Sequence, residues 1–340
     1  EGRRARDLVE RARNQVAALL GRPREQVVFT SGGTEANALG VLGLAALVEQ
    51  GGGPRVVVTT GIEHPSLAGA VATLARRGWE VRTVDARRRL GTDHCDPAAA
   101  VAVMGAGLVA LGLANHEVGT LADITTLAAA ARATGALVHV DAVQAAAKLA
   151  LADVPATALA ISAHKLGGPQ GVGALAITVD EALPLVDGGH QERGRRPGTE
   201  NFLGVIGFGA AAAAVVVDDL EPLAAVQAHL EAGLRALPDV RIHGDADVRL
   251  PGTTNAGFSG ALGESIVVAL DLAGIAVSTG AACTSGSVQP SAVLLGLGYP
   301  VAQAREAVRF SLGRTTTLAE VDAVLAALPA ILGRARRFRR

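Results

Sequence analysis

Short runs of β-branched and apolar residues alternate with alanine- and leucine-rich stretches over the first half of the chain. Strands that alternate with helices are joined by crossover connections, so this alternation predicts an α/β fold with a mainly parallel sheet and helices on both faces. Several of the runs are apolar throughout, which is typical of strands covered on both sides. The predicted strands occupy residues 27–30, 55–60, 80–85, 108–115, 137–143, 158–164 and 172–178. The predicted helices between them include 34–50, 66–78 and 125–135.

The alternation changes after residue 200. A long helical region (202–237), broken near "DDLEP", precedes shorter strand signals in "VRIHG", "TTNAGF" and "IAVSTG" and further helices. We therefore expect a large domain over 1–217 and a smaller C-terminal α+β domain over 218–340. The apolar run over 202–217 is interrupted by glycine and is too short for a membrane span, so a buried helix is expected there.

Charge and cysteine content exclude several classes of protein. The 31 Lys and Arg residues nearly balance 32 Asp and Glu residues, which leaves no basic footprint for nucleic acid. The two cysteines, Cys95 and Cys283, lie far apart and have no CxxC spacing. This usage argues against a disulfide scaffold or a metal site and predicts a reducing, cytoplasmic location. We interpret Cys95, in "GTDHCDP", as a surface cysteine in a turn.

Polar segments follow several of the predicted strands, where parallel sheets bind ligands. "TSGGTEAN" (30–37) places Gly33 and Thr34 at a helix start, where free backbone N–H groups can bind an anion. His64 of "EHPS" precedes the next helix, either as an imidazole that stacks on a flat ligand and carries protons or as an exposed loop residue. Asp141 of "VDAVQ" ends a buried strand and needs a partner, because burying a lone carboxylate is costly.

Lysine is rare in this chain, which contains only Lys148 and Lys165. Lys165 lies in "SAHKLGGPQGVG" (162–173), between a strand and a glycine-rich turn. A desolvated lysine at a strand end can act as an amine nucleophile, although a surface charge is the alternative. An amine for an imine bond, a carboxylate for a pyridine nitrogen, an imidazole for stacking and an anion nest together fit pyridoxal 5′-phosphate (PLP).

Nine segments of the chain together resemble cysteine desulfurases of the NifS/IscS type, which are fold-type I, class V aminotransferase-like PLP enzymes. The resemblance covers nearly the whole chain. It implies a seven-stranded large domain, a small C-terminal domain and a homodimer with active sites near the interface. The segments, in chain order, are "FTSGGTEAN", "EHPS", "NHEVGT", "VDAVQ", "SAHKLGGPQGVG", "ERGRRPGTEN", "STGAACTSGS", "QPSAVLLGLG" and "VRFSLG".

The resemblance assigns a role to each matching residue. Lys165 matches the lysine that bonds to the cofactor, and Asp141 matches the carboxylate paired with the pyridine nitrogen. Gln144 matches the partner of the ring hydroxyl, and His64 matches the stacking and acid–base histidine. The implied phosphate ligands and further residues near the cofactor are Gly33, Thr34, Ser162, His164, Asn115 and, reaching the other subunit, Thr199.

Cys283 and Arg309 complete the implied site. Arg309 of "VRFSLG" matches the arginine that binds the substrate carboxylate, where a planar two-donor fork is better suited than lysine, and Asn115 lies near the substrate. Cys283 of "STGAACTSGS" matches the nucleophile that receives sulfur from L-cysteine as a persulfide, leaving L-alanine. A transient iron–sulfur ligand is a further role for Cys283. The expected partner is a sulfur acceptor, either an iron–sulfur cluster scaffold or a thiolation protein, with no membrane involved.

The sequence departs from the family pattern at two places. His116 stands where "NNEVGT" would have its second Asn, near the cofactor hydroxyl. A "YLDxxATTP"-like segment, which usually precedes the first helix, is absent from the sequence. Alternative functions are therefore a selenocysteine lyase or aminotransferase of the same class, or a catalytically impaired protein that binds sulfur-transfer partners.

Overall fold

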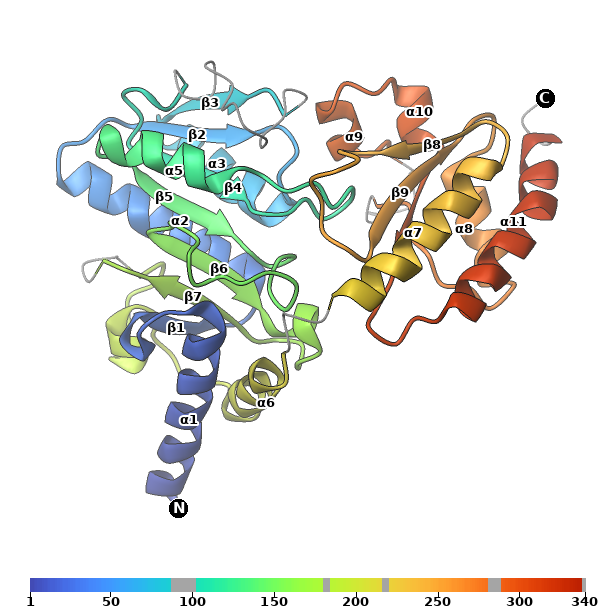
Figure 1. The fold of residues 1–340 in the computed structure, drawn as a ribbon. Helices are drawn as coiled ribbons and strands as arrows, with labels where there is room; N and C mark the ends of the chain where they lie inside the picture. The colour runs from blue at the N-terminus through green and yellow to red at the C-terminus, as the bar shows by residue number, and fades with distance from the viewer. Residues whose placement is uncertain (87–101, 180–183, 216–219, 281–288, 338–340) are drawn as a thin grey trace. The chain divides into compact units, whose positions relative to one another are not determined.

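A seven-stranded sheet carries the first part of the chain (Figure 1). The computed structural model describes residues 1–86, 102–179, 184–215, 220–280 and 289–337. Within this part, the strand order is β1-β7-β6-β5-β4-β2-β3, and every strand except β7 runs in the same direction. The strands are β1 (Val27–Thr30), β2 (Val56–Thr60), β3 (Glu80–Val84), β4 (Leu108–Gly112), β5 (Leu137–Asp141), β6 (Ala158–Ser162) and β7 (Gly173–Ile177). All seven match strands predicted from the sequence, which confirms the α/β fold class.

Helices cover both faces of this sheet. α2 (Gly33–Gln50) packs across the central strands and α3 (Pro65–Arg76) across β2 and β4, while α5 (Ile124–Ala133) packs against β4 and β5 from the other face (Figure 1). The strands β1, β2, β6 and β7 are buried along their whole length, as expected for a doubly covered sheet. β3 lies at the sheet edge and is mostly exposed.

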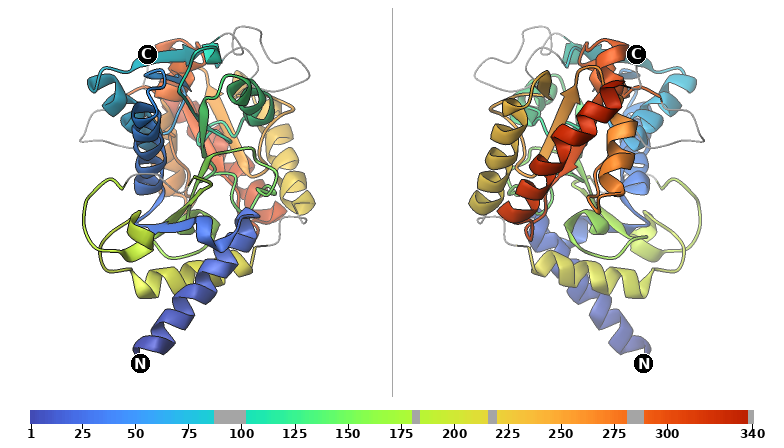
Figure 2. Two further views of the ribbon diagram at one scale, coloured as in Figure 1. Left: turned by 90° about the vertical axis from the view of Figure 1, so that its left-hand side faces the viewer. Right: turned by 90° about the vertical axis from the view of Figure 1, so that its right-hand side faces the viewer.

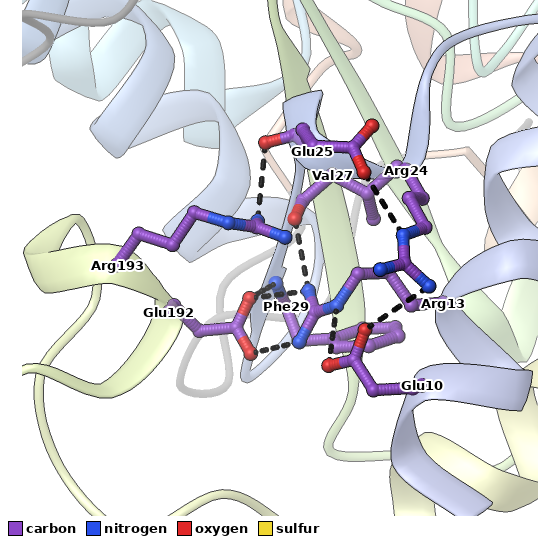
Figure 3. Close-up of polar contacts among 8 residues, drawn as sticks. All are labelled: Glu10, Arg13, Arg24, Glu25, Val27, Phe29, Glu192 and Arg193. Carbon is purple, nitrogen blue, oxygen red and sulfur yellow. Dashed lines mark hydrogen bonds and ion pairs between the residues drawn. The ribbon is translucent and has the colours of Figure 1, made fainter. Parts of the chain in front are cut away.

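A buried ion pair links the first helix to the sheet and to a distant turn (Figure 3). α1 (Gly2–Leu20) packs on α6 (Phe202–Ala213), and its Arg13 binds both carboxylate oxygens of Glu192 at 2.7 and 2.8 Å. Arg13 also donates to the carbonyl of Val27, and Glu192 accepts the N–H of Phe29. Glu192 lies in the short turn η3 (Gln191–Gly194) and has the left-handed backbone angle φ 46°. The ion pair thus anchors a strained turn to β1.

A three-stranded antiparallel sheet, in the order β10-β9-β8, carries the second part of the chain. One face of this sheet is covered by helices, as Figure 2 shows for the gold, orange and red segments. The strands are β8 (Val240–His243), β9 (Thr253–Phe258) and β10 (Ala307–Ser311). The helices are α7 (Glu221–Ala236), α8 (Gly263–Asp271), α9 (Ala292–Gly296), α10 (Val301–Arg305) and α11 (Leu318–Arg337).

The chain folds into two compact units. Unit 1 contains residues 1–114 and 122–217, and unit 2 contains residues 115–121 and 218–340. Each unit has its own apolar core. In the described residues no helix is both long enough and apolar enough to cross a membrane.

The strand expected in "IAVSTG" is wrong for the described residues. Only Ser278 of that segment pairs with a neighbour, through a single bridge to Arg309 of β10. The backbone of Gly280 then turns into the left-handed region, with φ 84°, which ends the extended conformation. β10 itself was not predicted as a strand, although its sequence "AVRFS" combines a β-branched and an aromatic residue.

Candidate active site

The carboxyl ends of β5 and β6 bring the main candidate residues of unit 1 together. Asp141 is the last residue of β5, Ser162 is the last residue of β6, and Lys165 lies in the short helix η2 (Ala163–Leu166) that follows. Burial raises the pKa of the Asp141 carboxyl, and Lys165 and His64 both act electrostatically on Asp141 and oppose this rise. A carboxylate, an amine and an imidazole thus share one edge of the sheet, although they come from three separate segments.

Asp141 is a buried acid with only part of its charge compensated. Burial raises the pKa of its carboxyl, whereas the N–H of Val143 at 2.9 Å and Asn37 Nδ2 at 2.7 Å stabilise the ionised form. A positively charged partner would stabilise the ionised carboxylate further, because burying a carboxylate is costly unless its charge is fully compensated. A protonated pyridine nitrogen would supply such a charge.

The beginning of α2 forms a cradle beside β5 and β6. A Cβ atom on Gly33 would lie 2.9 Å from a methyl group of Val143 and 3.4 Å from Cβ of Ser162, so the helix start packs tightly on both strand ends. Gly32, with φ 154°, adopts a backbone angle unfavourable for other residues. The N-terminal N–H groups of α2 and the exposed Thr34 are therefore placed near Ser162, which is typical of an anion site.

The other predicted ligands of unit 1 follow the ends of β2, β5 and β6 and vary in exposure. Ser162 Oγ and His164 Nδ1 are 2.9 Å apart, and burial and nearby Lys165 both lower the pKa of His164. Gln144 is half-buried in the turn after β5. His64 is exposed and caps α3, with its Nδ1 accepting the N–H of Ser66. Burial lowers the pKa of His64, which favours the neutral imidazole.

Thr199 lies in a different environment from the other predicted phosphate ligands. It is exposed and lines a cavity of about 1040 Å³ together with α1 and the turn at Glu192. None of the other predicted cofactor ligands lines this cavity. Its walls carry both signs of charge, from Arg6, Arg193 and Glu200 among others.

Unit 2 contains the remaining described candidates. Arg309 donates from Nη1 to the carbonyl of His116 at 2.9 Å, so the segment that carries Asn115 and His116 is fastened to β10. The side-chain oxygen of Asn115 accepts the N–H groups of Glu117 and Val118 and shapes the turn. The imidazole of His116 lies 3.8 Å from the carboxylate of Glu117.

Cys283 and Cys95 lie outside the described residues, but the described residues on either side of 281–288 converge on one carboxylate. Ser291 Oγ donates to Glu117 at 2.5 Å, and a Cβ atom on Gly280 would lie 2.7 Å from the same carboxylate. Burial raises the pKa of Glu117, while the bond from Ser291 opposes this shift. Glu117 therefore binds Ser291 and lies close to Gly280, on either side of the undescribed residues 281–288, a position the sequence did not indicate.

Two other buried side chains of the site were missed from sequence. Asn37 and His139 are fully buried and hydrogen-bonded to each other, and Asn37 also contacts Asp141. The signal was present in the segment "FTSGGTEAN", because an asparagine buried in a helix needs polar partners. In the described residues, no group of three or more His, Cys, Asp or Glu side chains could hold a metal ion.

Comparison with known proteins places this geometry in a family. The aminotransferase class-V family model matches residues 1–324. The chain belongs to the class-V aminotransferase family. Members of this family depend on PLP, which confirms the cofactor expected from the sequence. The donor set of the site fits that cofactor, since it offers an amine, a buried carboxylate, an imidazole and an anion cradle.

Several relatives of this chain are named cysteine desulfurases. The chain is 43% identical to the cysteine desulfurase of Bradyrhizobium diazoefficiens, over 98% of this chain and 86% of the relative. It is 40% identical to that of Nostoc sp., over 96% of this chain and 83% of the relative. A solved NifS-like protein superposes with a TM-score of 0.87 at 30% identity, over 98% of this chain and 89% of the other. These findings confirm the resemblance to PLP-dependent cysteine desulfurases.

The raised pKa of the buried Glu63 carboxyl predicts that the free energy of unfolding depends on pH. Thr60 Oγ1 at 2.5 Å and the N–H of Gly112 at 2.8 Å donate to it, and burial raises its pKa from 4.5 to about 7. The protonated acid therefore stabilises the fold below about pH 4.5, and this contribution is lost as the pH rises through about 7. The Glu63→Gln variant should lack this loss, which amounts to about 3 kcal/mol in the free energy of unfolding.

Urea unfolding at several pH values between about 4.5 and 8 measures this difference. The stability of the natural protein relative to Glu63→Gln should fall across that interval. Glu264→Gln, at an exposed position of α8, is the matched control and should follow the natural protein. Parallel curves for the natural protein and Glu63→Gln would contradict the raised pKa.

Proposed function

We propose that this protein is a PLP-dependent cysteine desulfurase that converts L-cysteine to L-alanine and takes up the sulfur as a persulfide on Cys283. The observation that carries the proposal is the convergence of Asp141, His64 and Lys165 at one edge of the sheet, where each affects the charge of another. The similarity to named cysteine desulfurases over nearly the whole chain supports the substrate class.

The residues of unit 1 would hold the cofactor. Lys165 would bond to the aldehyde carbon, Asp141 would pair with the ring nitrogen, His64 would stack on the ring and Gln144 would bind the ring hydroxyl. The phosphate would be held by the start of α2 at Gly33 and Thr34, by Ser162 and His164, and by Thr199 of a second copy. When bound, PLP supplies a conjugated ring that accepts the electron pair left at the substrate Cα.

The protein's own side chains move the protons and bind the substrate. Lys165 Nζ takes the proton from Cα of L-cysteine, and the neutral imidazole of His64 takes the proton from the substrate thiol. Arg309 binds the substrate carboxylate, with Asn115 and His116 in the segment to which it is fastened. In the net reaction, the sulfur of L-cysteine leaves its Cβ and bonds to the Cys283 sulfur. The carbon product takes up a proton to become L-alanine.

The partners follow from the persulfide product. A persulfide is consumed by transfer to another thiol or to a forming cluster, so the acceptor is an iron–sulfur scaffold or a thiolation protein. A homodimer is part of the proposal, with the exposed Thr199 of each copy reaching the phosphate site of the other. With two cysteines of 340 residues, the chain suits the reducing cytoplasm.

Comparison of the two cysteines tests the nucleophile. With PLP and L-cysteine, Cys283→Ala should form alanine at least ~100-fold more slowly than the natural protein, because the acceptor thiol is gone. Cys95→Ala is the matched control and should retain full activity. Mass spectrometry should find one added sulfur atom on the peptide of Cys283. Undiminished alanine formation in Cys283→Ala, or a persulfide on Cys95 alone, would rule out the assignment.

A further inference from the structure

One buried amide in unit 1, on α2, connects residues of two other elements, α3 and β5, that lie far from it in sequence. Asn37, on the second turn of α2, is fully buried. Its Nδ2 lies 2.7 Å from Asp141 Oδ2 and 2.9 Å from Ser66 Oγ, and its Oδ1 lies 3.0 Å from His139 Nε2. All hydrogen-bonding atoms of this side chain are therefore used.

The chemistry of the partners sets the direction of these bonds. The amide oxygen of Asn37 can only accept, so His139 carries its proton on Nε2 and donates it. The amide nitrogen donates one hydrogen bond to the carboxylate of Asp141 and another to the hydroxyl oxygen of Ser66. An Asn37 amide turned the other way would place its oxygen against the carboxylate oxygen of Asp141, where neither atom can donate.

His139 is held in the neutral form that this arrangement needs. Its imidazole is fully buried, burial lowers its pKa to about 3, and its Nδ1 has no hydrogen-bond partner among the described residues. A Cβ atom on Gly40 would lie 2.2 Å from Nδ1, so the missing side chain at Gly40 makes room for the ring. A buried imidazole with one nitrogen left without a hydrogen bond lowers stability. A role in orienting Asn37 explains why a histidine is present at this position.

The chain of bonds continues to His64. The backbone N–H of Ser66 can only donate, and it points to His64 Nδ1 at 3.2 Å, so this nitrogen carries a lone pair. Ser66 Oγ lies 2.7 Å from the same atom; because Ser66 Oγ accepts a hydrogen bond from Asn37, its own O–H is free to donate to His64 Nδ1. The imidazole of His64 consequently carries its proton on Nε2.

We propose that Asn37 is a positioning residue that orients the carboxylate of Asp141 and directs the Ser66 hydroxyl at His64 Nδ1, where it reinforces the tautomer set by the Ser66 N–H. The amide of Asn37 is itself oriented by His139. The roles of Asp141 and His64 in binding PLP rest on the proposed function. The hydrogen-bond directions depend only on the residues described. Other charged groups that act on Asp141 are His64 and Lys165, and Glu63 is also within electrostatic reach.

Nitrogen NMR of the protein without cofactor tests the bond directions directly. With imidazoles labelled with ¹⁵N, His139 should remain neutral with its proton on Nε2 from about pH 5 to 8, and the neutral form of His64 should show the same tautomer. In Asn37→Leu the Nδ1 signal of His64 should shift, because the Ser66 hydroxyl is no longer directed at this atom, while the Ser66 N–H still keeps the proton on Nε2. A proton on Nδ1 of His139, or a His139 that titrates in this range, would overturn the proposal.

Binding of PLP to the apoprotein tests the consequence for the site. Asn37→Asp keeps the shape of the side chain but sets an oxygen against Asp141, so the dissociation constant for PLP should rise ~10-fold or more. Asn14→Asp, at an exposed position of α1, makes the same chemical change and should bind PLP like the natural protein. Equal affinity in Asn37→Asp and the natural protein would overturn the proposal.

Two variants of His139 separate orientation from packing. The amide of His139→Gln can place an N–H near the position of Nε2, so this variant should bind PLP within ~3-fold of the natural protein, whereas His139→Leu should bind ~10-fold more weakly. The pH midpoint of the cofactor's visible absorbance should also shift in His139→Leu and not in His139→Gln. Identical midpoints and affinities in both variants would overturn the proposal.

These experiments distinguish the positioning role from the proposed function. Failure of the natural protein to bind PLP would refute the proposed function, while the NMR tautomers would still decide the bond directions. Normal PLP binding and alanine formation, together with unchanged behaviour of the Asn37 and His139 variants, would refute the positioning role alone.

Discussion

Lys165→Ala is expected to lose at least ~1000-fold in alanine formation from L-cysteine, because the variant lacks the amine that would bond to PLP and move the Cα proton. Lys165 follows β6 in η2, on the sheet edge that it shares with Asp141 and His64. Asp141 and the anion cradle remain, so the variant should still bind PLP weakly and reversibly. Alanine is quantified after incubation with L-cysteine and PLP.

The chain offers a matched control, since Lys148 is its only other lysine. Lys148→Ala should keep its activity. Borohydride reduction of the PLP-loaded natural protein, followed by peptide mapping, should place the cofactor on Lys165 and leave Lys148 unmodified. Cofactor trapped on Lys148, or an unchanged cofactor absorbance in Lys165→Ala, would show that the lysine was assigned wrongly.

Glu192→Gln is expected to destabilise the protein by about 3–5 kcal/mol, because it removes the charge that compensates the buried Arg13. Both side chains are almost fully buried, and their paired bonds of 2.7 and 2.8 Å join α1, β1 and the turn at Gln191–Gly194 (Figure 3). The left-handed backbone of Glu192 and Arg193 adds strain that the ion pair helps to offset. Unfolding in urea measures the loss of free energy.

The control is an ion pair of the same residue types in the same region. Arg24 and Glu25 lie 2.9 Å apart but are about half exposed, so Glu25→Gln should leave the free energy of unfolding nearly unchanged. Both pairs are drawn in Figure 3. A similar loss in both variants would mean that burial does not set the contribution of the Arg13–Glu192 pair. Thr199 follows this turn, so Glu192→Gln should also disturb the surface proposed for the second copy.

Much of the fold was predictable from the sequence because its signals are local. Most strands of the seven-stranded sheet are short apolar runs between turn residues, with the mostly exposed β3 as an exception, and the predicted ranges contain the observed ones. The exceptions are the edges of the small sheet, where "IAVSTG" makes one bridge and β10 was not recognised. At the edge of a sheet, an extended segment becomes a strand only if its backbone pairs with the neighbouring strand, which depends on the tertiary structure.

Site residues were predictable from the sequence where they belong to a rare residue type or lie at the end of a predicted strand. Lys165 stands out as one of two lysines, and Asp141 stands out as an acid that ends an apolar strand. Glu63 and Glu117 did not stand out, although the structure buries both carboxyls and raises the pKa of each. Their significance depends on donors that lie 49 and 174 residues away along the chain, at Gly112 and Ser291.

The sequence alone therefore determines the fold class, the family and the cofactor chemistry, since these depend on periodicity and on residue types in ordered segments. The tertiary structure decides how the polar side chains are oriented and protonated. Asn37 meets His139 and Asp141 across more than a hundred residues, and the direction of those bonds follows from which atoms meet. Hydrogen-bond direction is a property of three-dimensional contact, which the order of residues along a chain does not contain.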